Sequence, residues 1–315
     1  MPDETVLRVE RVTKTFGPVR AVDDLSFAVA AGTITGLLGR NGAGKTTTLR
    51  MINGIFLPDT GRIELLGAAD VAAVRDRVGY LPEERGLYRK MKVIEHLLFL
   101  AEIKGQPLPR ARQRAERWLE RFELADKRTA RVEELSKGNQ QKVQIIGALL
   151  HDPELVILDE PLSGLDPVNV VLVRGILQEL RASGKTVLLS THMMGEAEKT
   201  VDDIVLIHRG TAVLAGGLDE VRAAHGTDTV HLAFEGDGAF LTTLPGVARA
   251  RLDTNAAELE LRPGACTQEL LAAAMERLRI LRFEVAAPSL EQIFIDKVGG
   301  GTPSEPAAGA AEVRR

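Results

Sequence analysis

Hydrophobic and polar residues alternate at the start of the chain and then give way to short apolar runs. Residues 5–12 alternate, and residues 25–29 do so again, which predicts two strands with one buried face each. The apolar run at residues 34–38 predicts a buried strand, and a glycine-rich turn, G-R-N-G-A-G-K-T-T, follows it at residues 39–47. A helical pattern comes next. Strand, glycine turn and helix in this order are typical of an α/β fold.

Further apolar runs and helical patterns continue to about residue 226. Residues 91–124 carry apolar side chains at helical spacing and predict two helices. The stripe that contains Trp118 on the second of these indicates packing rather than a cofactor site. Other helices are expected from residue 136 and up to residue 182. Further strands are predicted at residues 61–66, 78–81, 155–158, 186–189, 204–207 and 213–215.

The pattern changes after about residue 226, where a smaller α+β domain is predicted. Residues 289–298 are amphipathic, and the Gly, Ala, Pro and Ser content from residue 299 predicts a disordered tail. We therefore expect three parts, residues 1–226, 227–298 and 299–315, with a helical subdomain at about residues 91–140 in the first. The small domain is expected in the order βαββαβ, with strands at 229–234, 248–252, 257–261 and 280–285 and helices at 238–243 and 267–278.

The composition is that of an ordinary globular protein. Of 315 residues, 44% are hydrophobic and 27% charged, and the net charge of −4 gives no electrostatic reason for a nucleic-acid partner. The single cysteine, Cys266, cannot form an internal disulfide and suits a reducing cytoplasm. No signal peptide is visible, and the longest apolar stretch is far shorter than the roughly 20 residues that span a bilayer. A role at the membrane would require a partner.

The glycine-rich turn at residues 39–47 has the chemistry of a phosphate-binding loop. Its glycines let backbone N–H groups converge on an anion, and the following helix adds partial positive charge. Lys45 is placed to reach the outer phosphates, and the Thr46 hydroxyl is placed to ligate Mg²⁺. An ordinary glycine turn is the alternative, but the flanking strand and helix favour a nucleotide site.

Two carboxylates follow a buried strand further along the chain. Asp159 and Glu160 come directly after residues 155–158, and ligands bind at the carboxyl edge of parallel sheets. Adjacent acids in such a place need a cation. His192 follows another apolar strand at the same edge, and we expect it to be functional. Phe16 has two interpretations, a core aromatic or a platform for an adenine ring.

Two polar turns complete a set of motifs. Residues 135–141, L-S-K-G-N-Q-Q, open a helix, a geometry that binds anions but also simply caps helices. Residues 163–166, S-G-L-D, form a turn after the acidic strand. With the phosphate loop, the Asp-Glu strand and His192, these elements occur in the order found in the ATPase subunits of ABC transporters. The chain resembles that family over about residues 5–225.

This resemblance implies a P-loop NTPase fold, with a RecA-like core, the family's β-subdomain and a helical subdomain. It also implies that Glu160 polarises the attacking water, that His192 contacts the γ-phosphate and that Asp159 joins Thr46 in binding Mg²⁺. The catalytic residues are then Glu160, His192 and Lys45. The residues implied to contact nucleotide are Phe16 on adenine, Gly39, Asn41, Gly42, Ala43, Gly44, Lys45, Thr46 and Thr47 on the phosphates, and Ser136, Gly138, Asn139 and Asp166 across a dimer seam.

Two positions depart from the family's usual pattern. Glu83 stands where Gln is usual, in the loop that senses the nucleotide and faces the membrane subunit, so it adds an acid near nucleotide and Mg²⁺. The signature turn has L-S-K-G-N rather than L-S-G-G-Q. Both variants, with E-E-R-G-L-Y at residues 83–88, resemble the branch of sodium- and drug-efflux ATPases. That branch carries a small C-terminal domain ending much like residues 289–294.

The expected function is therefore an ATPase that uses ATP and Mg²⁺ to drive a separate transmembrane permease, as part of an exporter. We expect a homodimer or pseudo-dimer with two ATP between its subunits, held through the permease at the cytoplasmic side of the cell membrane. A soluble ABC-type ATPase acting on ribosomes or DNA would show paired cassettes or basic insertions, which this sequence lacks. A catalytically idle binding subunit is disfavoured by the intact Lys45, Asp159, Glu160 and His192.

Overall fold

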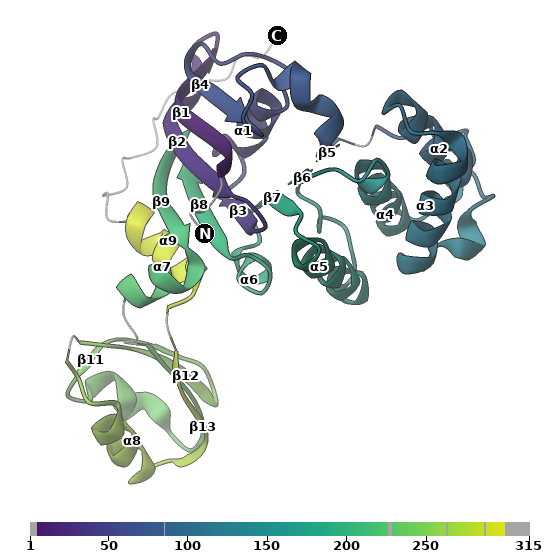
Figure 1. The fold of residues 1–315 in the computed structure, drawn as a ribbon. Coiled ribbons are helices and arrows are strands. Elements are labelled where there is room, and N and C mark those ends of the chain that lie inside the picture. The colour runs from purple at the N-terminus through teal and green to yellow at the C-terminus, as the bar shows by residue number, and fades with distance from the viewer. Residues whose placement is uncertain (1–4, 85, 226–228, 263, 287, 300–315) are drawn as a thin grey trace, which may run out of the picture. The chain divides into compact units, whose positions relative to one another are not determined.

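The chain forms two compact units in the computed structural model, Met1–Ala224 and His225–Arg315 (Figure 1). The expected boundary near residue 226 falls on residues 226–228, and the expected tail from residue 299 falls almost entirely on residues 300–315. Both lie outside the described residues. Among the residues that are described, no helix has both the length and the apolar character needed to cross a bilayer. The structure describes residues 5–84, 86–225, 229–262, 264–286 and 288–299.

A six-stranded sheet forms the centre of the first unit. Its strands are β3 Ile34–Leu38, β5 Val78–Leu81, β6 Leu155–Asp159, β7 Thr186–Thr191, β8 Asp203–His208 and β9 Thr211–Gly217. They lie in the order β5-β6-β7-β3-β8-β9, and all neighbours are parallel except β8 and β9. Strands β3, β6 and β7 are buried along their whole length, as continuous apolar runs require. The predicted α/β fold is confirmed.

A second, antiparallel sheet contributes to the same hydrophobic core. It contains β1 Thr5–Phe16, β2 Val19–Ala30 and β4 Thr60–Leu65, in the order β2-β1-β4. Both β1 and β2 are longer than the alternation predicts. The pairing of β1 shifts register between Val9 and Val12, where Arg11 has a positive φ of 47°. This irregularity breaks the period of two, although the strand continues to Phe16.

Helices cover the central sheet and form the predicted helical region. They are α1 Lys45–Ile52, α2 Val93–Ile103, α3 Leu108–Arg121, α4 Lys137–Leu149, α5 Pro167–Ala182, α6 Met194–Ala197 and α7 Leu218–Ala224, with 3₁₀ turns at Val71–Arg77, Ala125–Lys127 and Val132–Glu134. Helices α2, α3 and α4 contact one another and lie together in Figure 1. Trp118 packs on Phe122 with ring centroids 5.9 Å apart, beside the buried Leu119, as its stripe predicts.

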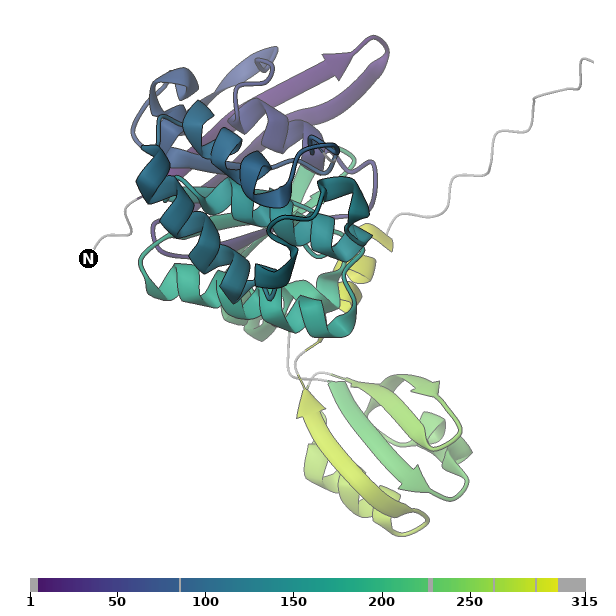
Figure 2. The same cartoon turned by 90° about the vertical axis from the view of Figure 1, so that its right-hand side faces the viewer.

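The described part of the second unit contains a four-stranded antiparallel sheet, two α-helices and a 3₁₀ turn (Figure 2). Its elements are β10 Thr229–Glu235, the 3₁₀ turn Gly238–Thr243, β11 Val247–Leu252, β12 Ala256–Leu261, α8 Thr267–Met275, β13 Arg279–Ala286 and α9 Leu290–Gly299. The order of these elements matches the predicted βαββαβ arrangement, but the helix predicted at residues 238–243 is a 3₁₀ turn and not an α-helix. The Leu244 N–H at the end of this turn donates to the Leu241 carbonyl oxygen three residues back, which is the spacing of a 3₁₀ helix.

Candidate active site

The phosphate loop joins the end of β3 to the start of α1 and depends on its glycines. Gly42 and Gly44 have φ values of +80° and +107°, a region that favours glycine. A Cβ atom at Gly39 would lie 2.4 Å from the Ile207 carbonyl oxygen, and one at Gly44 would lie 2.5 Å from the Ala21 carbonyl oxygen. The loop is therefore held tightly against β2 and β8. Its N–H groups precede a helix N-terminus, the geometry that binds phosphate.

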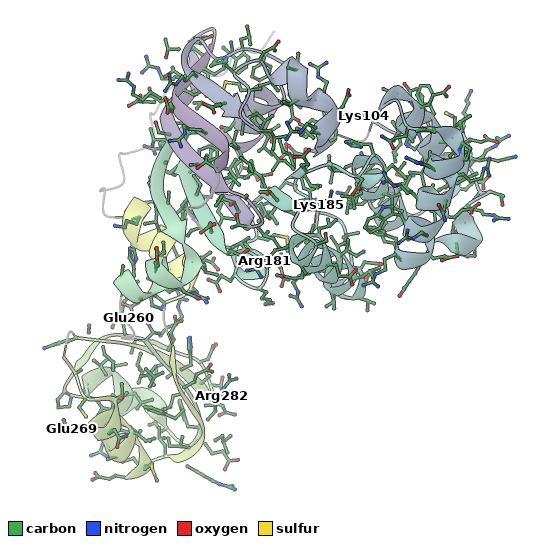
Figure 3. All side chains as sticks on the ribbon, in the orientation of Figure 1. Lys104, Arg181, Lys185, Glu260, Glu269 and Arg282 are labelled. Carbon is green, nitrogen blue, oxygen red and sulfur yellow. The ribbon has the colours of Figure 1, made fainter. Side chains whose placement is uncertain are left out.

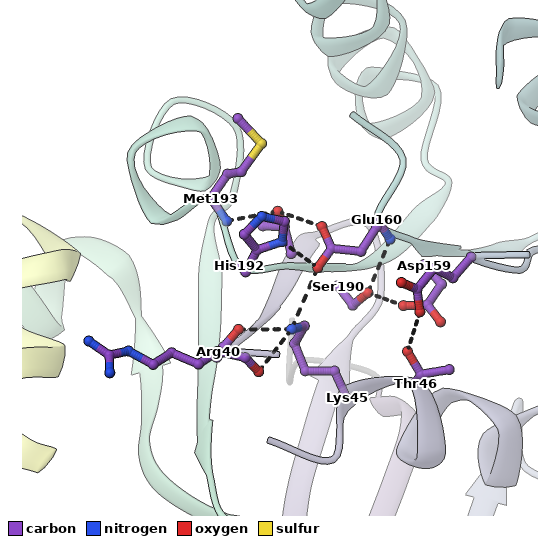
Figure 4. Close-up of polar contacts among 11 residues, drawn as sticks. Arg40, Lys45, Thr46, Asp159, Glu160, Ser190, His192 and Met193 are labelled. Atoms are coloured by element: carbon purple, nitrogen blue, oxygen red, sulfur yellow. Dashed lines mark hydrogen bonds and ion pairs between the residues drawn. The ribbon is translucent and has the colours of Figure 1, made fainter. Parts of the chain in front are cut away.

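Lys45 is the buried cation of the site, with only 6% of its surface exposed. Its ammonium donates to the carbonyl oxygens of Gly39 at 2.8 Å and Arg40 at 3.3 Å. The same ammonium lies 3.5 Å from Glu160 Oε1 (Figure 4). The first residue of α1 thus connects the phosphate loop to the acidic end of β6.

Glu160 lies just beyond β6 in an unusual backbone conformation. Its φ of +50° is in the left-handed region, which costs a non-glycine residue free energy and is found mainly at functional sites. The Glu160 N–H donates to the Ser190 carbonyl oxygen at 3.1 Å. Thr191 Oγ1 donates to Glu160 Oε2 at 3.2 Å, and His192 Nδ1 lies 2.9 Å from Oε1 (Figure 4). The end of β7 therefore fixes the carboxylate from both sides.

Asp159 provides a second carboxylate beside Thr46. The Ser190 hydroxyl donates to Asp159 Oδ1, whereas Oδ2 is buried and has no hydrogen-bond partner among the described residues. Burial raises the pKa of Asp159, and the hydrogen bond from Ser190 opposes that rise. Thr46 Oγ1 donates to Glu83 Oε2 at 3.2 Å. One hydroxyl and two carboxylates suit Mg²⁺, which takes oxygen ligands and keeps several waters.

The signature residues are held at a different place in the same unit. Ser136 caps α4 by accepting a hydrogen bond from the Asn139 N–H at 3.2 Å, and Gly138 lies next to the turn before α5. Asp166 caps α5 by accepting a hydrogen bond from the Asn169 N–H at 2.9 Å. Figure 1 shows α4 and α1 on different sides of β6. Among the described residues, Lys45 reaches Glu160, whereas the hydrogen bonds of Ser136 and Asp166 stay at the starts of their own helices.

Phe16 ends β1 with 48% of its surface exposed, so it is not a core aromatic. Its ring makes an edge-to-face contact with Phe56, with centroids 5.5 Å apart. The Lys14 ammonium lies 5.7 Å from the Phe16 centroid and is held by Asp59 at 2.7 Å. The exposed ring leaves room for a stacked base, and adenine contact stays a prediction.

A cavity of about 520 Å³ beside the Glu83 loop has no counterpart in the sequence patterns. Pro82, Gly86 and Leu87 contribute to its wall together with residues of β5, α2 and α4. His96 is fully buried there, and its ring nitrogens, Gln144 Oε1 and His151 Nδ1 have no hydrogen-bond partner among the described residues. Burial lowers the pKa of both histidines, which keeps them neutral at pH 7. Polar residues spread over three elements give no local motif, so only the fold brings them together.

The contacts of Ser190 and Thr191 with the two carboxylates are also not predicted by the sequence pattern. Both are buried and both hold the acids of β6, because β6 and β7 are parallel neighbours with Asp159 opposite Ser190. The available signal was two hydroxyl residues ending a buried strand directly before His192. That pattern marks a polar strand end, but it does not say which carboxylates the hydroxyls reach.

Comparison with known proteins accounts for this arrangement. A family model described as ABC transporter matches residues 22–163, and the ABC transporter ATP-binding protein YhaQ of Bacillus subtilis, itself uncharacterised, is 42% identical over 93% of this chain and 99% of its own. The chain belongs to the ATP-binding subunits of ABC transporters. ATP hydrolysis is the activity of this family, so the predicted family, fold and ATPase activity are confirmed. A second model, the C-terminal domain of DrrA1-3-like ATP-binding proteins, matches residues 216–298.

Other relatives of this ABC subunit extend over nearly its whole length. The daunorubicin resistance ATP-binding protein DrrA3 of Streptomyces coeruleorubidus is 32% identical over 94% of this chain and 96% of its own. The linearmycin resistance ATP-binding protein LnrL of Bacillus subtilis is 31% identical over 93% and 98%. A solved ATP-binding subunit of an ABC transporter superposes with a TM-score of 0.66 at 33% identity, covering 70% of this chain and 94% of that one.

Proposed function

We propose that this ABC subunit energises an exporter, with two ATP molecules bound between two cassettes in a head-to-tail dimer and a separate membrane permease moving the cargo. Two relatives aligned over nearly their whole length are named for resistance to linearmycin and to daunorubicin, which supports the export direction. Among solved structures with the same fold is a dimeric cassette bound to ADP and phosphate. The proposed location is the cytoplasmic side of the membrane, through the permease.

Glu160 is the proposed base, and its contacts support that role. The carboxylate is 8% exposed and is held by Thr191, His192 and Lys45, so it has a fixed direction beside the cation that would meet the outer phosphates. It orients the attacking water and accepts its proton at Oε1 or Oε2. His192, already hydrogen-bonded to Oε1, is proposed to contact the γ-phosphate.

Thr46, Asp159 and Glu83 are the proposed Mg²⁺ ligands, directly or through water. The unpartnered Oδ2 of Asp159 supports this assignment, because a buried carboxylate oxygen without a hydrogen bond is costly unless a cation satisfies it. When bound, Mg²⁺ neutralises phosphate charge. Glu83 adds a second carboxylate through its contact with Thr46, and we assign it to coupling rather than to the chemical step.

The remaining contacts belong to the dimer in this proposal. Phe16 stacks on adenine, and the backbone and side chains of residues 39–47 hold the phosphates. Ser136, Gly138 and Asn139 cap the γ-phosphate bound to the other cassette, with Asp166 at the seam. Helices α4 and α1 lie on different sides of β6 in Figure 1, which supports this, because a two-fold axis can bring the start of α4 in one chain to the phosphate loop of the other.

The division of labour between the parts of the chain is also a proposal. Residues 1–226 form the cassette, with a helical subdomain at about 91–140, and residues 227–298 form an accessory domain that regulates or stabilises the dimer. The match of residues 216–298 to a separate family model supports this division.

The cavity beside the Glu83 loop is the proposed contact for the permease. Its unpartnered His96, Gln144 and His151 atoms favour an occupant that brings hydrogen-bonding groups into an otherwise apolar space. Such an occupant would touch the loop that carries Glu83, which contacts Thr46, and so would connect the membrane subunit to the nucleotide. His96→Phe should weaken co-purification of the permease while the isolated subunit still binds ATP.

The convergence of Lys45, Thr191 and His192 on Glu160 carries the ATPase assignment. Because a positioned general base contributes about 10²–10⁴-fold, Glu160→Gln should lower turnover in the transporter complex by that factor. ATP binding should persist, since Lys45 keeps its two carbonyl contacts and loses a carboxylate that competes with phosphate. Glu154→Gln, at the opposite end of β6, is the matched control. Near-normal turnover of Glu160→Gln would contradict the assignment.

A further inference from the structure

The sheet of the second unit has two open edges, β11 and β13. The strand order β11-β12-β10-β13 leaves β13 paired with β10 alone among the described residues, and Figure 2 shows it along one side of the sheet. Arg282 and Glu284 on β13 have 69% and 47% of their side chains exposed, and Arg282 extends outward in Figure 3. An open edge presents unpaired N–H and C=O groups to any further strand.

Charges of opposite sign stand two positions apart on β13. Arg282 and Glu284 lie opposite Ala233 and His231 of β10, on the face of the sheet away from the core residue Leu232. They also form an ion pair with each other along the strand. Both side chains therefore share one face and remain available at the edge.

We propose that β13 pairs with β13 of a second copy of this chain, antiparallel and with Phe283 on the two-fold axis. This register sets Arg282 opposite Glu284 of the second copy, and the symmetry repeats the pair. Val285, which is 45% exposed, follows this charged pair along the same edge. The edge is thus self-complementary in charge.

The charges select this register and this edge. An axis at Arg282 would set Arg282 opposite itself, an axis at Glu284 would set Glu284 opposite itself, and like charges directly opposite are unfavourable. On the other edge of the sheet, Arg249 and Arg251 of β11 form ion pairs with Glu260 and Glu258 of β12. An axis in the middle of β11 would set these two arginines opposite each other, so β11 has no opposite charge to offer a second copy, whereas β13 has one.

The contact between two β13 edges is too short to form a stable dimer by itself. The pairing of β13 with β10 shifts register between Arg282 and Ile280, so the regular part of the edge begins at Arg282. One short strand edge is far smaller than the roughly 1,200 Å² of a stable independent interface. The edge would therefore strengthen the proposed cassette dimer, on which this inference rests, by making a second contact within an existing complex.

Disulfide trapping in the full-length protein tests the register directly. Cysteines are placed singly, as Arg282→Cys and as Glu284→Cys, in a Cys266→Ser background that removes the native thiol. Directly opposite residues lie about 5 Å apart at Cα, within disulfide range, whereas diagonal neighbours lie about 7–8 Å apart. The mixture of the two proteins should cross-link under mild oxidation and fastest with ATP, because the small edge alone holds two copies together only briefly and the disulfide traps those encounters. Each protein alone should cross-link far less.

Charge reversal tests the attraction. Arg282→Glu and Glu284→Arg should each weaken the ATP-dependent dimer roughly 10-fold in sedimentation, because both symmetry-related pairs become repulsive. The double exchange Arg282→Glu/Glu284→Arg restores complementarity and should return the dissociation constant to within about 3-fold of wild type. Arg251→Gln on β11 is the control and should have no effect.

Two outcomes would overturn the edge pairing. One is a wild-type protein that dimerises with ATP while the cysteine mixture gives no more cross-link than each protein alone. The other is a double exchange as weak as the single reversals. A wild-type protein that stays monomeric with ATP while the mixture still cross-links would instead contradict the proposed cassette dimer and leave the edge pairing in place.

Discussion

The shared nucleotide site can be tested by combining chains that each carry one defect. Lys45→Ala removes the ammonium that lies 2.8 Å from the Gly39 carbonyl oxygen and 3.5 Å from Glu160. Ser136→Arg places a long cationic side chain at the N-terminus of α4, the proposed cap for the nucleotide on the other chain. We expect each homodimer to lack ATPase activity in the transporter complex, because both of its sites then lack one half.

The structure indicates that both variants fold. Ser136 caps α4 through one hydrogen bond to the Asn139 N–H, and loss of such a cap costs about 1 kcal/mol, against a total stability of roughly 5–15 kcal/mol. Lys45→Ala deletes a buried cation but leaves Glu160 with its Thr191 and His192 contacts. Ser136→Ala loses the same cap without adding bulk, so it separates the effect of the cap from steric exclusion and should stay partly active.

The expected ATPase activity of each heterodimer follows from the two-fold symmetry of the proposed dimer. A heterodimer of Lys45→Ala with Ser136→Arg has one site with both halves intact and one with both defects, so it should have about half the wild-type activity if sites act independently. A heterodimer of wild type with the double variant Lys45→Ala/Ser136→Arg has one defect in each site and should be inactive. The two heterodimers contain the same substitutions in the same amounts, and only their distribution differs.

The assay is phosphate release from heterodimers isolated through two different affinity tags. If the site lies within one chain, the result reverses, with activity in the wild-type/double heterodimer and none in the mixture of single variants. That reversal would refute the shared site. Thermal unfolding of each variant, compared with wild type, verifies that inactivity is not loss of the fold.

Three further predictions concern single features. Phe16→Ala should raise the dissociation constant for ATP roughly 10-fold, since base stacking contributes about 1–3 kcal/mol, and should leave the dissociation constant for inorganic tripolyphosphate unchanged. Equal losses of affinity for both ligands in a binding titration would contradict the adenine contact. Glu83→Gln should keep most of the ATPase activity, because Thr46 keeps a hydrogen-bond acceptor and Asp159 stays in place; a loss as large as that of Glu160→Gln would reverse the two assignments. Burial lowers the pKa of His96 and His151 below 6.5, so the unfolded chain binds more protons in acid than the folded protein does, and the melting temperature should fall as the pH drops below about 6.5. Removing one of these histidines as His96→Phe should make the melting temperature less dependent on pH. An unchanged slope of melting temperature against pH would contradict this role of His96.

The sequence predicts well those parts of the site that local pattern and chemistry determine. The phosphate loop is recognisable because a strand, three glycines and a helix must be contiguous for the backbone to meet an anion. Asp159 and Glu160 are recognisable because acids at the end of a fully apolar strand need a cation. The position of Lys45 near Glu160 follows only from the fold, since β3 and β6 are not neighbours and β7 lies between them.

The contacts that escape prediction depend on which strands become neighbours. Ser190 reaches Asp159 because β6 and β7 pair in parallel with these residues opposite. Phe16 leaves the core because β1 continues past the irregularity at Arg11, which ends its alternating pattern early. The cavity with His96 and Gln144 forms where β5, α2 and α4 meet. In each case the residue type is visible in the sequence, but its partner is set by pairings distant along the chain.

The left-handed backbone of Glu160 connects these observations to mechanism. Its N–H must turn to the Ser190 carbonyl while its side chain turns to Lys45 and His192, and a φ of +50° accompanies this arrangement. Three contacts to the side chain, together with the backbone hydrogen bonds to Ser190 and from the Ser163 N–H, offset the conformational cost. Because Lys45 is one of them, a phosphate that draws Lys45 away changes the support of the proposed base at the moment of binding. The hydrogen bond from Thr191 and the contact with His192 then hold the carboxylate alone, so the end of β7 is where nucleotide binding would first alter the geometry of the catalytic group.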